Sequence, residues 1–182
     1  MAVAQRVVIA AHHPAPRKIA MGAETLRRGG VIALPGDFGP RIAALAHDKG
    51  ACMRVEGQVA KRSPLTLYCR DIAALASLTR IQNGVYRQLK KLNACELQLP
   101  IGRGMPNHLR NRKPAPTYAI VQQPIAHNLL AAIDAPLATW PLCEGDTPVE
   151  DVAVVRQRFA FIDLIYDVDE VSWWPVQVLD FR

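Results

Sequence analysis

The sequence predicts a single α/β domain. The chain has 182 residues, half of them hydrophobic, which is enough to bury one substantial core. Short apolar runs typical of strands alternate with segments of helical periodicity along the whole length. No repeat of 20–50 residues and no low-complexity tract interrupts that pattern. Residues 1–182 are therefore expected to form one domain.

The first helix is expected at 17–28. Its apolar residues Ile19, Ala23 and Leu26 recur at spacings of three and four, which puts them on one face of a helix. Gly29 and Gly30 follow at once, and glycine readily adopts the left-handed turn that ends helices.

The later elements follow from the same signals. Asp71 is suited to cap a helix at 72–78, and Pro124 precedes a helix at 125–133. The remaining helices are expected at 43–55, 82–92 and 148–159, and the strands at 7–10, 31–34, 65–69, 95–99, 118–121, 137–139, 161–166 and 176–181.

The longest segment without periodicity is 100–116. Long loops inside compact domains are usually functional or disordered. This one combines glycine, asparagine and proline with four cations, namely Arg103, Arg110, Arg112 and Lys113.

Charge is divided unequally along the chain. Residues 1–133 hold 19 Lys and Arg against 6 Asp and Glu, whereas residues 134–182 hold 3 against 10. Within residues 72–133 the only acid is Glu96. Such a basic segment favours polyanions, although it could instead pair with the acidic C-terminal part or simply face solvent.

Several classes of function have no support in the sequence. The four cysteines are far apart and form no CxxC pair, so free buried thiols are expected and no metal site is. Neither a phosphate-binding glycine loop, a GxSxG elbow nor an HExxH helix is present. Without a long apolar segment or a signal-like N-terminus, we expect a cytoplasmic protein with no membrane partner.

Five stretches resemble the YrdC/YciO family, which includes threonylcarbamoyl-AMP synthases. They are ETLRRGGVIALPGD, SPLTLYCRDIAAL, QQPIAHNLLAAIDAPLATW and the C-terminal pair FIDLIYD and PVQVLDF. The likeness runs from about residue 17 to the C-terminus and is nearest to the YciO branch. It implies a twisted, open, mixed α/β sheet of the YrdC/RibB-like type with a basic concave face. Active members join threonine, bicarbonate and ATP for tRNA modification, and members have been described as binding double-stranded RNA.

Much of the polar machinery that this resemblance implies is replaced in the chain. Of a Pro-Thr-Asp-Thr segment only Pro35 and Asp37 remain. A Lys-x-Arg pair maps to Lys61, helped by Arg62, and a Ser-x-Asn segment maps to 140–142, which reads Trp-Pro-Leu. Together with Thr139, the residues Pro35, Asp37 and Lys61 form the expected remnant of the family pocket.

Three functions remain open. The first is a non-catalytic protein that needs no cofactor and binds RNA, either double-stranded RNA or tRNA, or another polyanion through its basic face. The second is an ATP-dependent enzyme of the synthase type with a remodelled site, and the third is a module that docks a protein partner through Trp140, Trp173 and Trp174. The polyanion-binding candidates are Lys61, Arg62, Arg87, Lys90, Lys91, Arg103, Arg110, Arg112 and Lys113.

Overall fold

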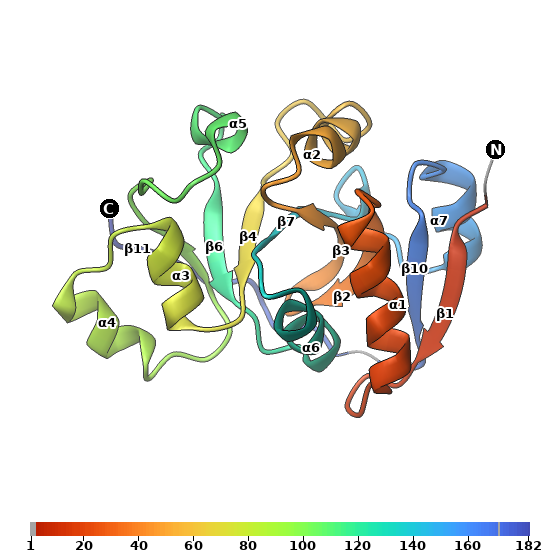
Figure 1. The fold of residues 1–182 in the computed structure, drawn as a ribbon, viewed down its shortest axis with the longest axis horizontal. Coiled ribbons are helices and arrows are strands. Elements are labelled where there is room, and N and C mark those ends of the chain that lie inside the picture. The colour runs from red at the N-terminus through yellow and green to blue at the C-terminus, as the bar shows by residue number, and fades with distance from the viewer. Residues whose placement is uncertain (1–2, 171) are drawn as a thin grey trace.

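The computed structural model describes residues 3–170 and 172–182, and in this part of the chain nine strands form one sheet (Figure 1). The strand order is β1-β10-β2-β3-β7-β4-β6-β5-β11. The bounds are β1 Gln5–Ile9, β2 Ile32–Gly36, β3 Gly39–Leu45, β4 Thr66–Cys69, β5 Glu96–Gln98, β6 Thr117–Ile120, β7 Leu137–Pro141, β10 Leu164–Val168 and β11 Val178–Asp180.

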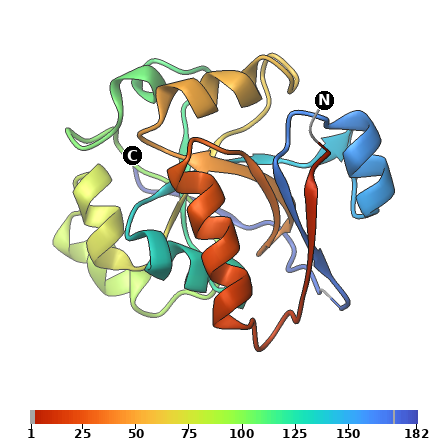
Figure 2. The ribbon, with the colours of Figure 1, turned by 45° about the vertical axis from the view of Figure 1, so that its right-hand side comes forward.

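The sheet is mixed and open. Strands β1, β10 and β2 are parallel, the pairs β2–β3, β3–β7 and β7–β4 are antiparallel, and β4 runs parallel to β6. Beyond β6, the strand β5 pairs antiparallel with β6 and parallel with β11, which forms the far edge. The expected single α/β domain with a twisted mixed sheet is confirmed, and the twist is visible when Figures 1 and 2 are compared.

Two apolar clusters pack against the sheet because successive strand residues point to opposite faces. On β2, Ile32 and Leu34 belong to the cluster with helices α1 and α6, whereas Ala33 belongs to the cluster with α2, α3, α4, α5 and α7. The helices are α1 Pro16–Arg27, α2 Lys49–Glu56, α3 Ile72–Leu78, α4 Asn83–Leu89, α5 Asn107–Arg110, α6 Pro124–Ile133 and α7 Val152–Arg158. Within the described residues, none of these helices has both the length and the apolar character that a membrane span requires.

The helix predicted at 43–55 is wrong in its first part. Residues up to Leu45 belong to β3, and the helix α2 begins only at Lys49, after Asp48 has capped it through a hydrogen bond from the Ala51 N–H. Alanine favours helices, which is why Ala43 and Ala44 predicted one. Pairing of β3 with strands on both sides overrides that preference.

Other differences concern boundaries and short elements. Helices α4 and α7 are shorter than the predicted 82–92 and 148–159. A small hairpin of β8 Cys143–Glu144 and β9 Thr147–Pro148, turning at Gly145 with φ 59°, was not predicted. The segment 100–116 contains the short helix α5.

Candidate functional site

Asp37 lies in the turn between β2 and β3 and is only 5% exposed. Its carboxylate accepts hydrogen bonds from the backbone N–H of Gln122 at 3.1 Å and of Gln123 at 2.7 Å. These two residues immediately precede α6. Burial raises the pKa of Asp37, and the two N–H groups oppose that rise. The carboxylate is therefore engaged in joining the turn to the start of α6.

Thr139 on β7 is fully buried and is also engaged. The Arg41 guanidinium donates to the Thr139 hydroxyl from Nε at 3.2 Å and from Nη2 at 3.1 Å, and the hydroxyl donates to the Thr66 carbonyl at 2.8 Å. The guanidinium also lies over the Tyr68 ring, 5.8 Å from its centroid. Burial raises the pKa of Tyr68 to about 12 even though the Arg41 charge opposes that rise.

Arg41 is a functional candidate that the sequence analysis did not include. It is 7% exposed and forms no ion pair within the described residues. Burial of a cation without a carboxylate partner costs free energy. Arg41 and the hollow that it borders are therefore candidates for a functional site. In the sequence, the signal that could have identified Arg41 is that it is the one charged residue in the largely apolar run 38–46.

Trp140 occupies the first position of the segment that maps to the family's Ser-x-Asn. The residue is fully buried in the apolar cluster of α2, α3, α4, α5 and α7. Its indole N–H has no hydrogen-bond partner among the described residues. Trp173 is half-buried and donates to Glu150, whereas Trp174 is 46% exposed, so the three tryptophans do not present a common surface.

Of the predicted arginines, Arg112 ties the 100–116 segment to its surroundings and Arg110 makes bonds within the segment. Arg112 donates from Nε to Glu56 at the end of α2 at 2.6 Å and from Nη2 to the Ser63 carbonyl at 2.5 Å, and its side chain is 10% exposed. Arg110 donates to the Arg103 carbonyl at 3.0 Å and the Met105 carbonyl at 3.2 Å. Both guanidinium groups are thus partly engaged inside the protein.

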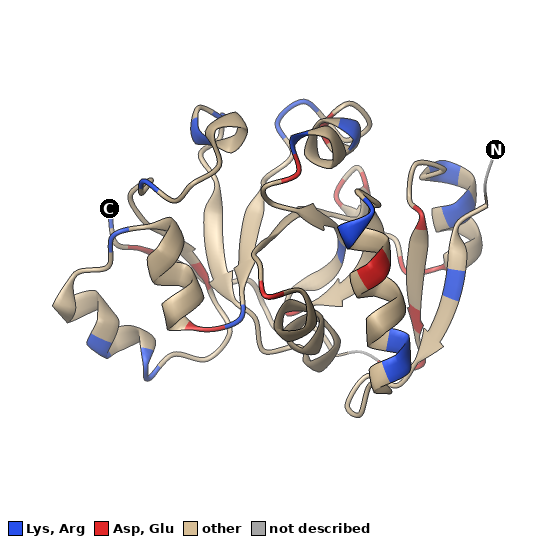
Figure 3. Cartoon of the chain, in the orientation of Figure 1, with Lys and Arg blue, Asp and Glu red and all other residues tan. Residues whose placement is uncertain are grey.

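Four exposed cations lie on the two segments that the Arg112–Ser63 contact joins. Arg112 bonds to Ser63, so its neighbour Lys113 lies beside the segment that contains Lys61 and Arg62, and Arg110 holds the backbone of Arg103. We name the four exposed residues Lys61, Arg62, Arg103 and Lys113 the α2–α5 surface. None forms an ion pair within the described chain, and Figure 3 shows basic segments in the connections beside α2 and α5.

The other three predicted cations lie elsewhere. Arg87, Lys90 and Lys91 are exposed on and just after α4, with the Lys90 ammonium 4.7 Å from the centroid of the Tyr86 ring. In Figures 1 and 2, α4 lies at a corner apart from α2 and α5. The nine predicted cations therefore form two groups.

Two hollows of similar size lie on either side of Pro40 and Leu142. The first, of about 480 Å³, is bordered by Arg41, Arg62 and Ser63, with Asp146 as its one acidic residue. The second, of about 470 Å³, is bordered by Glu150, Asp167, Asp169 and Glu170, and no Lys or Arg is among its lining residues. The sign of the charge therefore changes from one hollow to the next.

The predicted remnant pocket is divided among these features. Pro35 lines the acidic hollow, whereas Asp37 borders a smaller one of about 170 Å³ beside Gln122 and Gln123. Lys61 is on the exposed surface, and Thr139 is inside the core. No group of three or more potential metal ligands was found among the residues that the structure describes.

Comparisons with known proteins agree with this fold. The chain is 27% identical over 177 residues to an uncharacterized protein of Haemophilus influenzae, covering 92% of this chain and 86% of that protein. It is 27% identical over 176 residues to the uncharacterized protein YciO of Escherichia coli, with 92% and 85% covered.

Solved structures show the same arrangement. The crystal structure of E. coli YciO superposes with a TM-score of 0.85 at 25% identity, covering 98% of this chain and 90% of that one. The crystal structure of P. abyssi Sua5 complexed with L-threonine gives a TM-score of 0.83 at 20% identity, covering 96% of this chain and 54% of that one. The family model for Sua5, YciO and YrdC, described as telomere recombination, matches residues 24–172. The chain therefore belongs to the Sua5/YciO/YrdC family.

Proposed function

We propose that this chain binds double-stranded RNA through the α2–α5 surface and does not perform the synthase chemistry of its family. The observation that carries the proposal is the group of four exposed cations, Lys61, Arg62, Arg103 and Lys113, that have no acidic partner in the described chain. Duplex RNA is recognised mainly by its shape and its phosphate backbone, for which exposed Lys and Arg are suitable ligands.

The rigidity of the connection supports this assignment. Arg112 binds Glu56 and Ser63 on one side and is followed by Lys113 on the other. Arg112 therefore joins the two segments that carry the cations before any ligand arrives, which reduces the conformational entropy lost on binding. Their backbone is anchored while their charged ends remain in solvent.

Three contacts count against catalysis of the family's kind. Asp37 is engaged by two backbone N–H groups, the Thr139 hydroxyl is bonded to Arg41 and Thr66, and Trp140 fills a core position. The threonine hydroxyls and the Ser-x-Asn groups of active members have no replacement at these positions. Loss of a single donor that stabilises developing charge can cost about 10²–10³ in rate, so the combined loss is severe.

The proposal is tested by fluorescence anisotropy with a labelled RNA duplex of about 20 base pairs, long enough to span the roughly 16 base pairs that a duplex-binding module covers. With four phosphate contacts, the logarithm of the binding constant should fall with the logarithm of salt concentration with a slope of about −3.6. The triple variant Lys61→Glu, Arg62→Glu and Lys113→Glu should weaken binding at least about tenfold.

A matched control changes the same number of charges on α4. The triple variant Arg87→Glu, Lys90→Glu and Lys91→Glu should retain affinity within about threefold, because only long-range attraction is lost. Arg110 and Arg112 are left unchanged because their internal contacts support the loop. Absence of salt-dependent binding near physiological ionic strength, or equal losses in both variants, would refute the proposal.

The enzyme alternative is favoured by one observation, the 480 Å³ hollow bordered by Arg41 and Arg62, which has room for part of a nucleotide. It predicts pyrophosphate release from ATP when threonine and bicarbonate are present. We expect no release above the rate without protein, and release that depends on Arg62 would establish the alternative instead.

A further inference from the structure

The acidic hollow of about 470 Å³ is walled by elements that are distant in sequence. They are the ends of β2 and β10, helix α7, the residues around β9, and the segment that follows β10. Its volume is within the range of about 300–1,000 Å³ that small-molecule sites occupy. It is therefore of a size for a small molecule.

The floor of this hollow is apolar. Ala33, Pro40, Leu142, Val149 and Ile165 border it, and all but Pro40 are buried members of the core. Trp173 adds an aromatic wall, and its indole N–H donates to Glu150 Oε1 at 2.8 Å. That bond joins the segment after β10 to the residues before α7.

The polar groups at the rim are mainly carboxylates. Glu150, Asp169 and Glu170 are exposed and form no ion pair within the described residues. Asp167 also borders the hollow, but Arg6 neutralises it through an ion pair at 2.5 Å, and Arg6 itself is outside the lining. His12 and Ser172 are the remaining lining residues with polar side chains, besides Tyr166 and the Trp173 indole.

From these features we propose that the hollow binds a small organic cation, an amine or guanidinium group carried on a short apolar body. The carboxylates would accept hydrogen bonds from the charged head, the floor would cover the apolar body, and the Trp173 ring offers a face for a cation. An anion such as a nucleotide phosphate would meet three unpaired carboxylates and would be repelled. This site is separate from the α2–α5 surface and does not depend on RNA binding.

The test titrates the full chain with hexylamine hydrochloride and follows the Trp173 indole signal by nitrogen–proton NMR. At about 0.15 M salt, long-range attraction is largely screened, so a response requires local contact. Hexylamine should shift the Trp173 signal in a saturable way. Hexanol should bind more weakly because it lacks the charge, and hexanoate should have no effect.

Matched variants identify the carboxylates that bind the cation. Glu150→Gln together with Glu170→Gln should weaken hexylamine binding about five- to tenfold, whereas Glu24→Gln on α1 should leave it unchanged because that carboxylate is outside the hollow. Since Glu150 and Glu170 are exposed, neither change is expected to unfold the protein. Equal responses to hexylamine and hexanoate, or no saturable shift at all, would overturn the proposal.

Discussion

The Asp37 carboxylate accepts hydrogen bonds that the N–H groups before α6 would otherwise donate to solvent or to a ligand. Its carboxylate receives N–H groups from both residues that precede the helix. A buried N–H without a partner costs about 1–3 kcal/mol, so the role of Asp37 can be measured as stability. Asp37 therefore has at least a structural role in joining the β2–β3 turn to α6.

We predict that Asp37→Ala lowers the free energy of unfolding by about 1–3 kcal/mol, because two N–H groups lose their acceptor. Asp37→Asn should cost less, since its side-chain oxygen can still accept at least one of these bonds. Urea unfolding followed by circular dichroism measures both. Equal stability of Asp37→Ala and the parent chain would show that these contacts contribute nothing.

At the same scale, the sequence could locate candidate residues but not their partners. Asp37 was predicted to belong to a remnant of the family pocket, yet only the fold shows that Gln122 reaches it across 85 positions of sequence. Arg112 was predicted to contact polyanions, and its bond to Glu56 spans 56 positions. Pairings of that kind depend on tertiary contact and have no local sequence signal.

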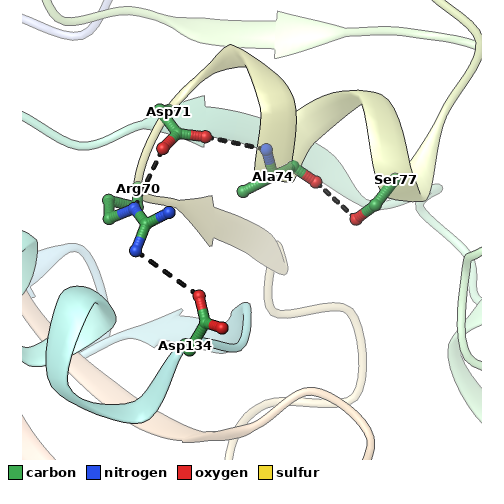
Figure 4. A network of polar contacts seen from close by, with 5 residues as sticks. All are labelled: Arg70, Asp71, Ala74, Ser77 and Asp134. Carbon is green, nitrogen blue, oxygen red and sulfur yellow. Dashed lines mark hydrogen bonds and ion pairs between the residues drawn. The ribbon is translucent and has the colours of Figure 1, made fainter.

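Among the elements, helix α3 shows how a local signal can determine a boundary. Asp71 was predicted to cap it, and its carboxylate accepts the Ala74 N–H at 2.8 Å, as Figure 4 shows. Arg70 donates to the same carboxylate and contacts Asp134, the residue that ends α6. Hydrogen bonds lower the pKa of Asp71 below its ordinary value of 3.8, and the bond from the Ala74 N–H contributes more than the bond from Arg70.

The cap predicts a stability difference that depends on pH. At neutral pH, Asp71→Ala should lower the free energy of unfolding by about 1 kcal/mol. The pKa of the folded state is below that of the unfolded state, so the ionic contribution is complete above pH 3.8 and disappears as pH falls through the folded value. Urea unfolding of both chains between pH 2.5 and pH 7 checks this, and a gap that widened in acid would contradict it.

Prediction of elements from sequence fails where neighbours in space decide. The helix α1 was predicted within one residue at each end, because a periodic apolar face and two glycines are local features. Ala43 and Ala44 were assigned to a helix, yet both belong to β3, which lies between β2 and β7 in the centre of the sheet. Ala43 pairs with Ile32 on β2. Which alanine-rich segment becomes a central strand depends on partners up to a hundred residues away.

On the scale of the whole molecule, one sheet connects two apolar clusters. Strands β2, β3, β4 and β7 each contribute alternate residues to both. Loss of packing on one side therefore removes support from the other, because the same backbone carries both sets of side chains. The domain is expected to unfold as a single cooperative unit.

This expectation can be tested by a substitution in one cluster and a fluorescent reporter in the other. Leu129→Ala on α6 should lower the free energy of unfolding by about 2–5 kcal/mol, because Leu129 is fully buried. In a chain where Trp173 and Trp174 are changed to Phe, the fluorescence of Trp140 in the opposite cluster should report the same lower midpoint as circular dichroism. Separate midpoints for the two signals would mean that the clusters unfold independently.

The position of β10 between β1 and β2 sets the order in which the protein can be completed during synthesis. Within the described sheet, strand β1 pairs with β10 alone, so residues 5–9 are synthesised long before their partners, residues 164–168. The outer strand β11 arrives later still and covers β5. Until residues 164–168 have been made, β1 and the edge of β2 that faces β10 are unpaired, and this is the stage at which chaperones or a ribosome-bound factor would have to protect the nascent chain from aggregation.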